Sequence, residues 1–64
     1  ILTQREYQCL TLSSQSFTSE GIAKKLKITK RTVDFHMKNV NNKLGVNSRY
    51  QAVNEAILQG LIES

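Results

Sequence analysis

The chain has 64 residues, 39% of them hydrophobic, which suffices for one domain with a small core, and no apolar run is long enough for a transmembrane helix. Its single cysteine, Cys9, cannot form an internal disulfide or supply a zinc cluster, so we expect a small core residue there and no metal site. The net charge of +4 excludes little by itself, because a solvated basic surface explains it as well as a polyanion partner does.

The first predicted helix begins after Thr3, because Thr3 followed by Glu6 three residues later is a capping box. The serine-rich stretch 13–16 ends this helix, since serines favour caps and turns over helix interiors. The side chains expected to face inward are Tyr7, Cys9 and Leu10.

A short second helix begins after Thr18 or Ser19 and runs to about Lys25. Its apolar face consists of Ile22, Ala23 and Leu26. Thr29 caps the next helix, so the connection after Leu26 has room for only three or four residues. Two helices joined so closely cross at a steep angle, as in a helix-turn-helix motif.

The third predicted helix covers 30–44 and ends at Gly45. One apolar stripe contains Val33, Met37, Val40 and Leu44. The opposite face offers cations, amides and an aromatic ring, from Lys30, Arg31, Asp34, Phe35, Lys38, Asn41 and Asn42. Asn47 or Ser48 caps a fourth helix over 49–59, which Gly60 ends. We therefore predict an all-α, four-helix fold that forms one domain over 1–64.

Basic residues concentrate in the middle of the chain. Eight of the nine Lys and Arg residues lie between Lys24 and Arg49, opposed only by Asp34, which gives this segment a net charge of +7. The remainder has one arginine against four glutamates, a net charge of −3. A basic middle between acidic ends is typical of a protein that binds a polyanion. For Lys24 and Lys27 we favour plain solvation.

Three stretches of the sequence together resemble the LuxR-type helix-turn-helix family. The longest is Thr32-Val33-x-Phe35-His36-x-x-Asn39-Val40-x-x-Lys43-Leu44-Gly45-Val46-x-x-Arg49-x-x-Ala52-Val53. The others are Leu2-Thr3-x-Arg5-Glu6-x-x-Cys9-Leu10 at the start and Gly60-Leu61-Ile62 at the end. The resemblance implies the four-helix DNA-binding domain of a bacterial transcription factor, the C-terminal part of a longer cytoplasmic regulator, which is not an enzyme and needs no cofactor. The segment Val33-Asp34-Phe35-His36 looks most like the quorum-sensing branch, and the output domain of a two-component response regulator is the alternative.

Three positions depart from the family pattern. Gly21 stands where the family usually has Glu, which removes a capping-box partner for Thr18 and costs about 1 kcal/mol of helix stability. Ser16 stands where the family often has Gly, so we expect a different geometry in that turn. Asp34 replaces Asn or a basic residue, which prevents any inference of the target sequence.

Carried over from the family, the base-reading positions fall on Asp34, Phe35 and Lys38. For Asp34 we slightly favour a local ion pair with Lys30 or Lys38 over a base contact. The expected DNA backbone contacts are Thr18, Lys25, Lys30, Arg31, Thr32, His36, Lys43 and Arg49. Of these, Lys43 is expected to strengthen binding to all duplexes alike, and His36 is as readily explained as a packed core residue.

The expected partners are double-stranded DNA, a second copy of the chain and RNA polymerase, with no membrane. Ala52 and Ala56 are small residues four apart on the fourth helix, and they suit either a two-fold dimer contact or core packing against the first helix. The rival interpretation is a helical protein-interaction module that never touches DNA. An enzyme is disfavoured because no paired nucleophile and base or glycine-rich phosphate loop is present.

Overall fold

The computed structural model describes residues 1–63 and contains no strand among them. Its four helices are α1 (Gln4–Ser14), α2 (Ser19–Leu26), α3 (Lys30–Leu44) and α4 (Arg49–Leu58). The predicted all-α, four-helix fold is therefore confirmed, with ends that differ from the prediction by a residue or two. None of the helices in this part of the chain combines the length and the hydropathy needed to cross a bilayer.

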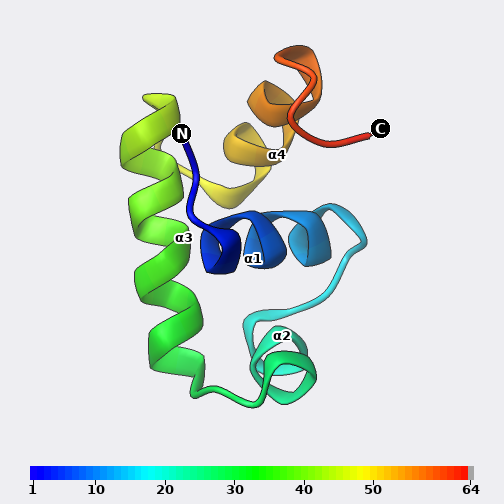
Figure 1. Ribbon diagram of the computed structural model, residues 1–64, viewed down its shortest axis with the longest axis vertical. Coiled ribbons are helices and arrows are strands. Elements are labelled where there is room, and N and C mark those ends of the chain that lie inside the picture. The colour runs from blue at the N-terminus through cyan, green and yellow to red at the C-terminus, as the bar shows by residue number, and fades with distance from the viewer. Residues whose placement is uncertain (64) are drawn as a thin grey trace.

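The helix α3 is the longest element, and the other three pack along it (Figure 1). Helix α1 crosses its middle, α2 lies toward its N-terminal end and α4 toward its C-terminal end (Figure 1). Helices α1 and α3 each contact all the other helices, whereas α2 and α4 do not pack on each other. This arrangement leaves one long side of α3 without a covering helix.

Each helix begins with a hydroxyl cap, as the sequence predicts. The hydroxyls of the four capping residues accept hydrogen bonds from the N–H groups three residues on; the caps are Thr3, Thr18, Thr29 and Ser48. At α1 the cap is a complete capping box, because the Glu6 carboxylate accepts from the N–H of Thr3 at 3.0 Å. At α2, Gly21 occupies the matching position and supplies no side chain.

Left-handed backbone ends several of the helices. Gly45 closes α3 with φ +71°, and Gly60 follows α4 with φ +73°. Lys27 and Ser16 adopt the same conformation, with φ +59° and +73°. Serine takes here the left-handed conformation that glycine takes without a Cβ penalty, at a cost of about 1 kcal/mol. A turn geometry that differs from that of the family stays a prediction.

The core lies where α1 meets the other helices. Its fully buried residues are Cys9, Leu10, Ile22, Val33, Val40, Ala52 and Ala56. The prediction that Tyr7 faces inward was wrong, since its side chain is 46% exposed. The inward face of α1 instead recurs at Glu6, Cys9, Leu10 and Ser13, which follow the helical spacing of three and four residues.

Two of those inward residues are polar, and each finds a partner on α3. The Ser13 hydroxyl lies 3.8 Å from the sulfur of Met37. The Glu6 carboxylate accepts from the Nζ of Lys43 at 2.6 Å, which makes an ion pair between α1 and α3. Burial by itself raises the pKa of Glu6, but the hydrogen bonds from Lys43 and from the Thr3 N–H outweigh it, so the pKa lies below its ordinary value.

Candidate nucleic-acid interface

Helix α2 is joined to α3 by a three-residue turn. Lys27 is left-handed, the N–H of Ile28 donates to the carbonyl of Ala23 at 3.0 Å, and Thr29 caps α3. Buried Ile22 and Val33 hold the two helices together in the core. The connection is as short as the sequence predicts, and it joins α2 and α3 in a helix-turn-helix motif.

The uncovered side of α3 carries the predicted base-reading positions. Asp34, Phe35 and Lys38 are exposed there, together with Arg31 and Asn42. The Phe35 ring is 58% exposed, so its outward position, inferred from the sequence, is confirmed. Neither Arg31 nor Lys38 has an ion-pair partner within residues 1–63, which leaves both cations available to an outside ligand.

Asp34 is held by two neighbours. Its Oδ2 lies 3.3 Å from the Nζ of Lys30, and its Oδ1 accepts from the hydroxyl of Ser19 at 2.9 Å. The hydrogen bond from Ser19 contributes most to lowering the pKa of Asp34, and Lys30 adds to it against the effect of burial. The favoured local ion pair is thus confirmed, with Lys30 as the partner, and the base contact stays a prediction.

Ser19 also accepts a hydrogen bond from the guanidinium of Arg49 at the start of α4. This contact occupies Arg49, which we expected to bind phosphate. From the sequence, Ser19 is only a candidate cap for α2, and its bridging position is not evident. No signal in the sequence finds it, because its partners lie 15 and 30 residues away.

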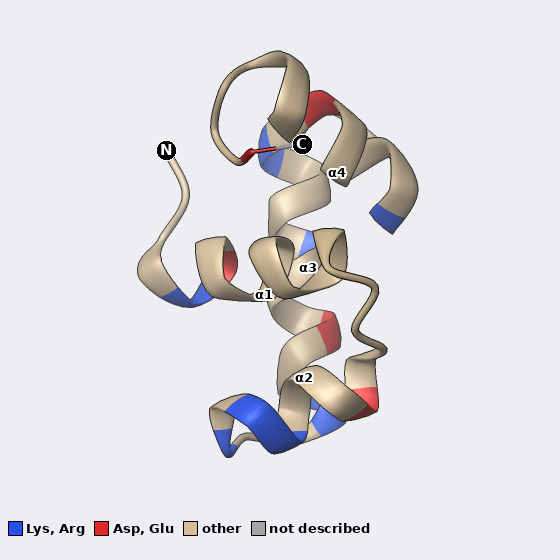
Figure 2. Cartoon of the chain, turned by 90° about the vertical axis from the view of Figure 1, so that its right-hand side faces the viewer, with Lys and Arg blue, Asp and Glu red and all other residues tan. Residues whose placement is uncertain are grey.

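The remaining predicted phosphate contacts gather at one end of the molecule. Lys25, Lys30 and Arg31 are exposed, as are Lys24 and Lys27, and all five belong to the last residues of α2, the turn or the start of α3. Figure 2 shows this basic end along α2, the turn and the first turn of α3. The hydroxyls expected to assist them, Thr18 and Thr32, lie in the first turns of α2 and α3, at or next to the caps. A helix start offers free N–H groups as well, so both features suit an anion.

Lys43 makes a contact within the protein that the sequence did not predict. Its Nζ is bound to buried Glu6 and also donates to the carbonyl of Ile1 at 3.3 Å. A lysine that neutralises a buried carboxylate is a structural partner, and moving it to a phosphate would leave that carboxylate unpaired. We therefore leave Lys43 out of the proposed DNA contacts.

His36 is half-buried beside the outward face of α3. Its ring centroid lies 5.8 Å from that of Phe35, at an interplanar angle of 60°. Residues 1–63 contain no group of three or more His, Cys, Asp or Glu side chains placed to hold a metal ion. Packing against Phe35 is the contact that the structure shows for His36.

The prediction that Ala52 and Ala56 form a dimer contact requires correction. Both are fully buried within a single chain, so neither has surface to offer a partner. The alternative, core packing where α4 meets α1, is confirmed. The exposed large apolar side chains of α4 are Tyr50, 86% exposed, and Leu58, 73% exposed, which sequence analysis did not single out.

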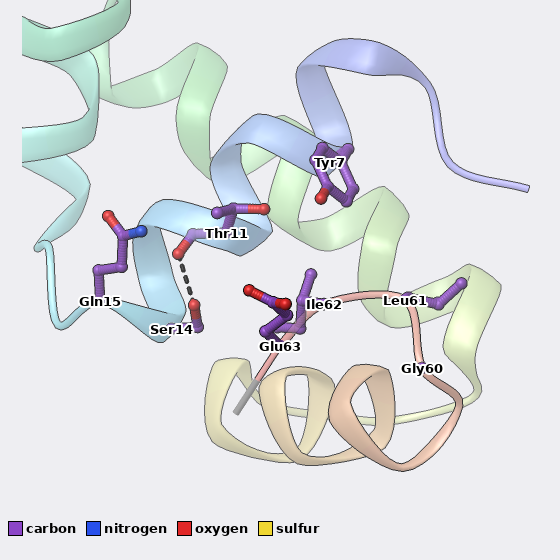
Figure 3. A pocket seen from close by; sticks show the side chains of 8 residues that line it. All are labelled: Tyr7, Thr11, Ser14, Gln15, Gly60, Leu61, Ile62 and Glu63. Atoms are coloured by element: carbon purple, nitrogen blue, oxygen red, sulfur yellow. Dashed lines mark hydrogen bonds between the residues drawn. The ribbon is translucent and has the colours of Figure 1, made fainter.

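A separate hollow lies between α1 and the C-terminal segment 60–63 (Figure 3). In Figure 3, Tyr7, Thr11 and Gln15 line its α1 side, and Leu61 and Glu63 line the other. Its lining contains no lysine, arginine or histidine, so it offers no cation to a polyanion. The candidate interface is therefore the basic end and the uncovered face of α3.

A short capped helix, a tight turn and a longer helix with a free polar and basic face define the class: this is a helix-turn-helix DNA-binding domain. The family described as bacterial regulatory proteins of the luxR family matches residues 1–56. The chain belongs to this family, which consists of transcription regulators and is not a class of enzymes.

Individual relatives agree with the family assignment. The chain is 44% identical to the transcriptional activator protein VanR of Vibrio anguillarum over 97% of its own length and 26% of that protein's. It is 40% identical to the transcriptional activator protein LuxR of Aliivibrio fischeri, over 97% of this chain and 25% of that protein. It is 38% identical to the transcriptional regulatory protein DegU of Brevibacillus brevis, over 98% of this chain and 27% of that protein. The chain thus spans about a quarter of the length of these relatives.

Two solved structures share the fold. The transcription factor GerE is 37% identical, with a TM-score of 0.87 over 92% of this chain and 88% of that one. The response regulator ChrA of a heme-sensing two-component system is 35% identical, with a TM-score of 0.93 over 97% of this chain and 31% of that one.

Proposed function

We propose that this domain binds double-stranded DNA by laying α3 in the major groove, and that it serves a quorum-sensing transcriptional regulator of the bacterial cytoplasm. The observation that carries the first part is the uncovered face of α3, where Arg31, Phe35 and Lys38 are exposed together. B-form DNA admits one α-helix into its major groove, and α3 is the helix whose outer face is free to enter.

Sequence is read by Lys38 and Phe35 in this proposal. The Lys38 ammonium donates to guanine O6 and N7, and the exposed Phe35 ring contacts a thymine methyl. Affinity comes from phosphates, through Lys25, Lys30 and Arg31. Thr18, Thr32, His36 and Arg49 are further candidates at the edges of the same surface. Each cation that neutralises a phosphate releases a counterion, so affinity falls steeply as salt rises.

The direct test is selection of duplexes from a randomised library with the 64-residue chain, followed by titration of the selected duplex at several salt concentrations. Enrichment of a defined site and a linear, negative log–log salt slope support the proposal. The rival, a helical protein-interaction module, predicts no enrichment and no duplex binding at low salt.

The quorum-sensing branch is supported by the segment Val33-Asp34-Phe35-His36 and by relatives named transcriptional activators, VanR and LuxR among them. The second candidate is the output domain of a two-component response regulator, favoured by the likeness to the response regulator ChrA. The intact parent protein separates the two. Operator binding that changes on addition of acyl-homoserine lactones supports the first, and binding that changes on phosphorylation supports the second.

We also propose that two copies associate through α4 and read an inverted repeat. Because Ala52 and Ala56 are buried, the contact falls on Tyr50 and Leu58, whose apolar side chains are largely exposed. Two-fold symmetry places the half-sites about 10 base pairs apart. A selected site with one half only, bound by a monomer in sedimentation, contradicts this.

A further inference from the structure

Asp34 is an anomaly on the proposed DNA-binding face. A carboxylate there is repelled by phosphates, yet it lies among exposed cations on the outward side of α3. Both of its oxygens are already engaged, Oδ2 by Lys30 and Oδ1 by Ser19. The position that would otherwise read a base is thus occupied with contacts inside the protein.

Ser19 uses both hydrogen-bonding capacities of its hydroxyl. It donates to Asp34 on α3 and accepts from Arg49 at the first turn of α4. Helices α2 and α4 do not pack on each other, so this hydroxyl is a polar link across the gap between their starts. One chain of contacts, from Arg49 through Ser19 and Asp34 to Lys30, therefore connects three helices.

The chain of contacts has a consequence for charge. The carboxylate of Asp34 offsets Lys30 directly, and it lies close enough to Arg49 for that guanidinium to help lower its pKa. Two cations that the proposed function counts among the candidate phosphate contacts, Lys30 and Arg49, are therefore partly neutralised from within. Since sequence-independent affinity comes from cations on phosphates, an internal carboxylate lowers binding to all DNA and leaves discrimination to the base-reading side chains.

We propose that Asp34 and Ser19 are positioning residues that set the specificity of this domain. They hold the first turns of α2 and α4 against α3, and they weaken, without abolishing, the binding of Lys30 and Arg49 to phosphates of any sequence. The inference rests on the proposed function, because it assumes that α3 faces DNA.

The test compares two duplexes, the site selected by the chain and a scrambled sequence of the same composition, across a range of salt concentrations. Asp34→Asn removes the charge and leaves an amide oxygen that still accepts from Ser19. We expect tighter binding to the scrambled duplex and a log–log slope steeper by about 0.9, the value for one more neutralised phosphate. The ratio of affinities for the selected and scrambled duplexes falls.

Glu20→Gln is the matched control. Glu20 is an exposed carboxylate one residue from Ser19 in the first turn of α2, and its loss changes the net charge by the same amount. It takes no part in the chain of contacts, so the slope and the affinity ratio stay at wild-type values. Ser19→Ala changes no charge and removes both hydrogen bonds of the hydroxyl; it lowers the affinity ratio measured well below its melting temperature.

The outcomes are distinguishable. If the wild-type chain binds neither duplex, the proposed function fails. If it binds, but Asp34→Asn and Glu20→Gln shift the slope equally, the effect is one of net charge and the inference fails. If Asp34→Asn retains its melting temperature but loses the selected site at every salt concentration, Asp34 reads a base and the inference is overturned.

Discussion

Replacing Lys43 by methionine removes the partner of a buried carboxylate. The side chain of Glu6 is 5% exposed and that of Lys43 is 37% exposed, so the variant leaves an ionised group with little access to water. Stranding one member of a buried pair costs about 3–5 kcal/mol. Because the Lys43 side chain is partly exposed, we expect some water to replace the lost ammonium and the cost to be about 2–3 kcal/mol. A domain of this size has about 3–5 kcal/mol in total, so the variant is close to unfolding.

Replacing the other member of the pair, Glu6, costs less stability. Glu6→Gln keeps an oxygen that accepts from the N–H of Thr3, and it leaves the ammonium of Lys43 free to reach water. We expect a loss of about 1 kcal/mol for this variant. The double variant is more stable than Lys43→Met alone, because it strands no charge.

The same ion pair predicts how the free energy of unfolding changes with pH. In the wild type, the lowered pKa of Glu6 contributes stability that is present above its ordinary value of 4.5 and is lost as the pH falls through the folded-state pKa. In Lys43→Met the ammonium no longer offsets the effect of burial, so the pKa of Glu6 is higher than in the wild type. The difference in free energy of unfolding between the two is therefore largest near neutral pH, and it narrows as the pH falls through the folded-state pKa of Glu6 in the variant toward the lower one in the wild type.

Urea denaturation of the four proteins at pH 7 and at several acidic pH values measures all of these quantities. Equal losses for Lys43→Met and Glu6→Gln, or a gap that does not change with pH, would refute the reasoning. A duplex titration of Glu6→Gln in the same series tests the earlier expectation for Lys43. Wild-type DNA affinity and salt slope are expected, whereas tighter binding by the released lysine would show that Lys43 reaches phosphate.

The remaining predictions concern other positions. Gly21→Ala raises the melting temperature by about 4–8 °C, because helix propensity improves by about 1 kcal/mol. The added Cβ meets the side chains of Phe17 and Thr18 at 3.4 Å, so a lower melting temperature means that these contacts are too tight. Ser16→Gly stabilises the chain by up to about 1 kcal/mol by relieving its left-handed φ, measured by denaturation, and a loss contradicts the strain. Lys38→Ala loses about 1–3 kcal/mol of discrimination at one base position in a binding-site selection, and uniform weakening of all sequences contradicts its role. Leu58→Asp leaves the melting temperature unchanged and weakens binding to an inverted repeat but not to a half-site, and equal effects contradict the dimer contact.

Signals that act over three or four residues predicted the fold. The Thr3–Glu6 capping box, the cap at Thr29 and the left-handed Gly45 all appear where the sequence places them, because each is decided within one helical turn. The inward stripe of α3 followed from periodicity for the same reason. These elements bring α2 and α3 into the arrangement that exposes the candidate interface.

Contacts between distant residues were not predictable. Glu6 and Lys43 are 37 residues apart, and each had a sufficient local explanation, one as a cap and the other as a surface cation. Likewise, small residues at Ala52 and Ala56 indicate a close approach without saying which surface approaches. Periodicity says which side chains share a face, and packing decides what that face meets.

The measurement that tests the account most directly is an NMR titration of the chain with its selected duplex, with intermolecular nuclear Overhauser effects assigned. We predict contacts from Phe35 and Lys38 to major-groove base protons, with shifted amides along Lys30, Arg31 and the rest of the outer face of α3. Contacts from α4 or from the hollow beside Tyr7, with the amides of 30–42 unmoved, would contradict the central claim.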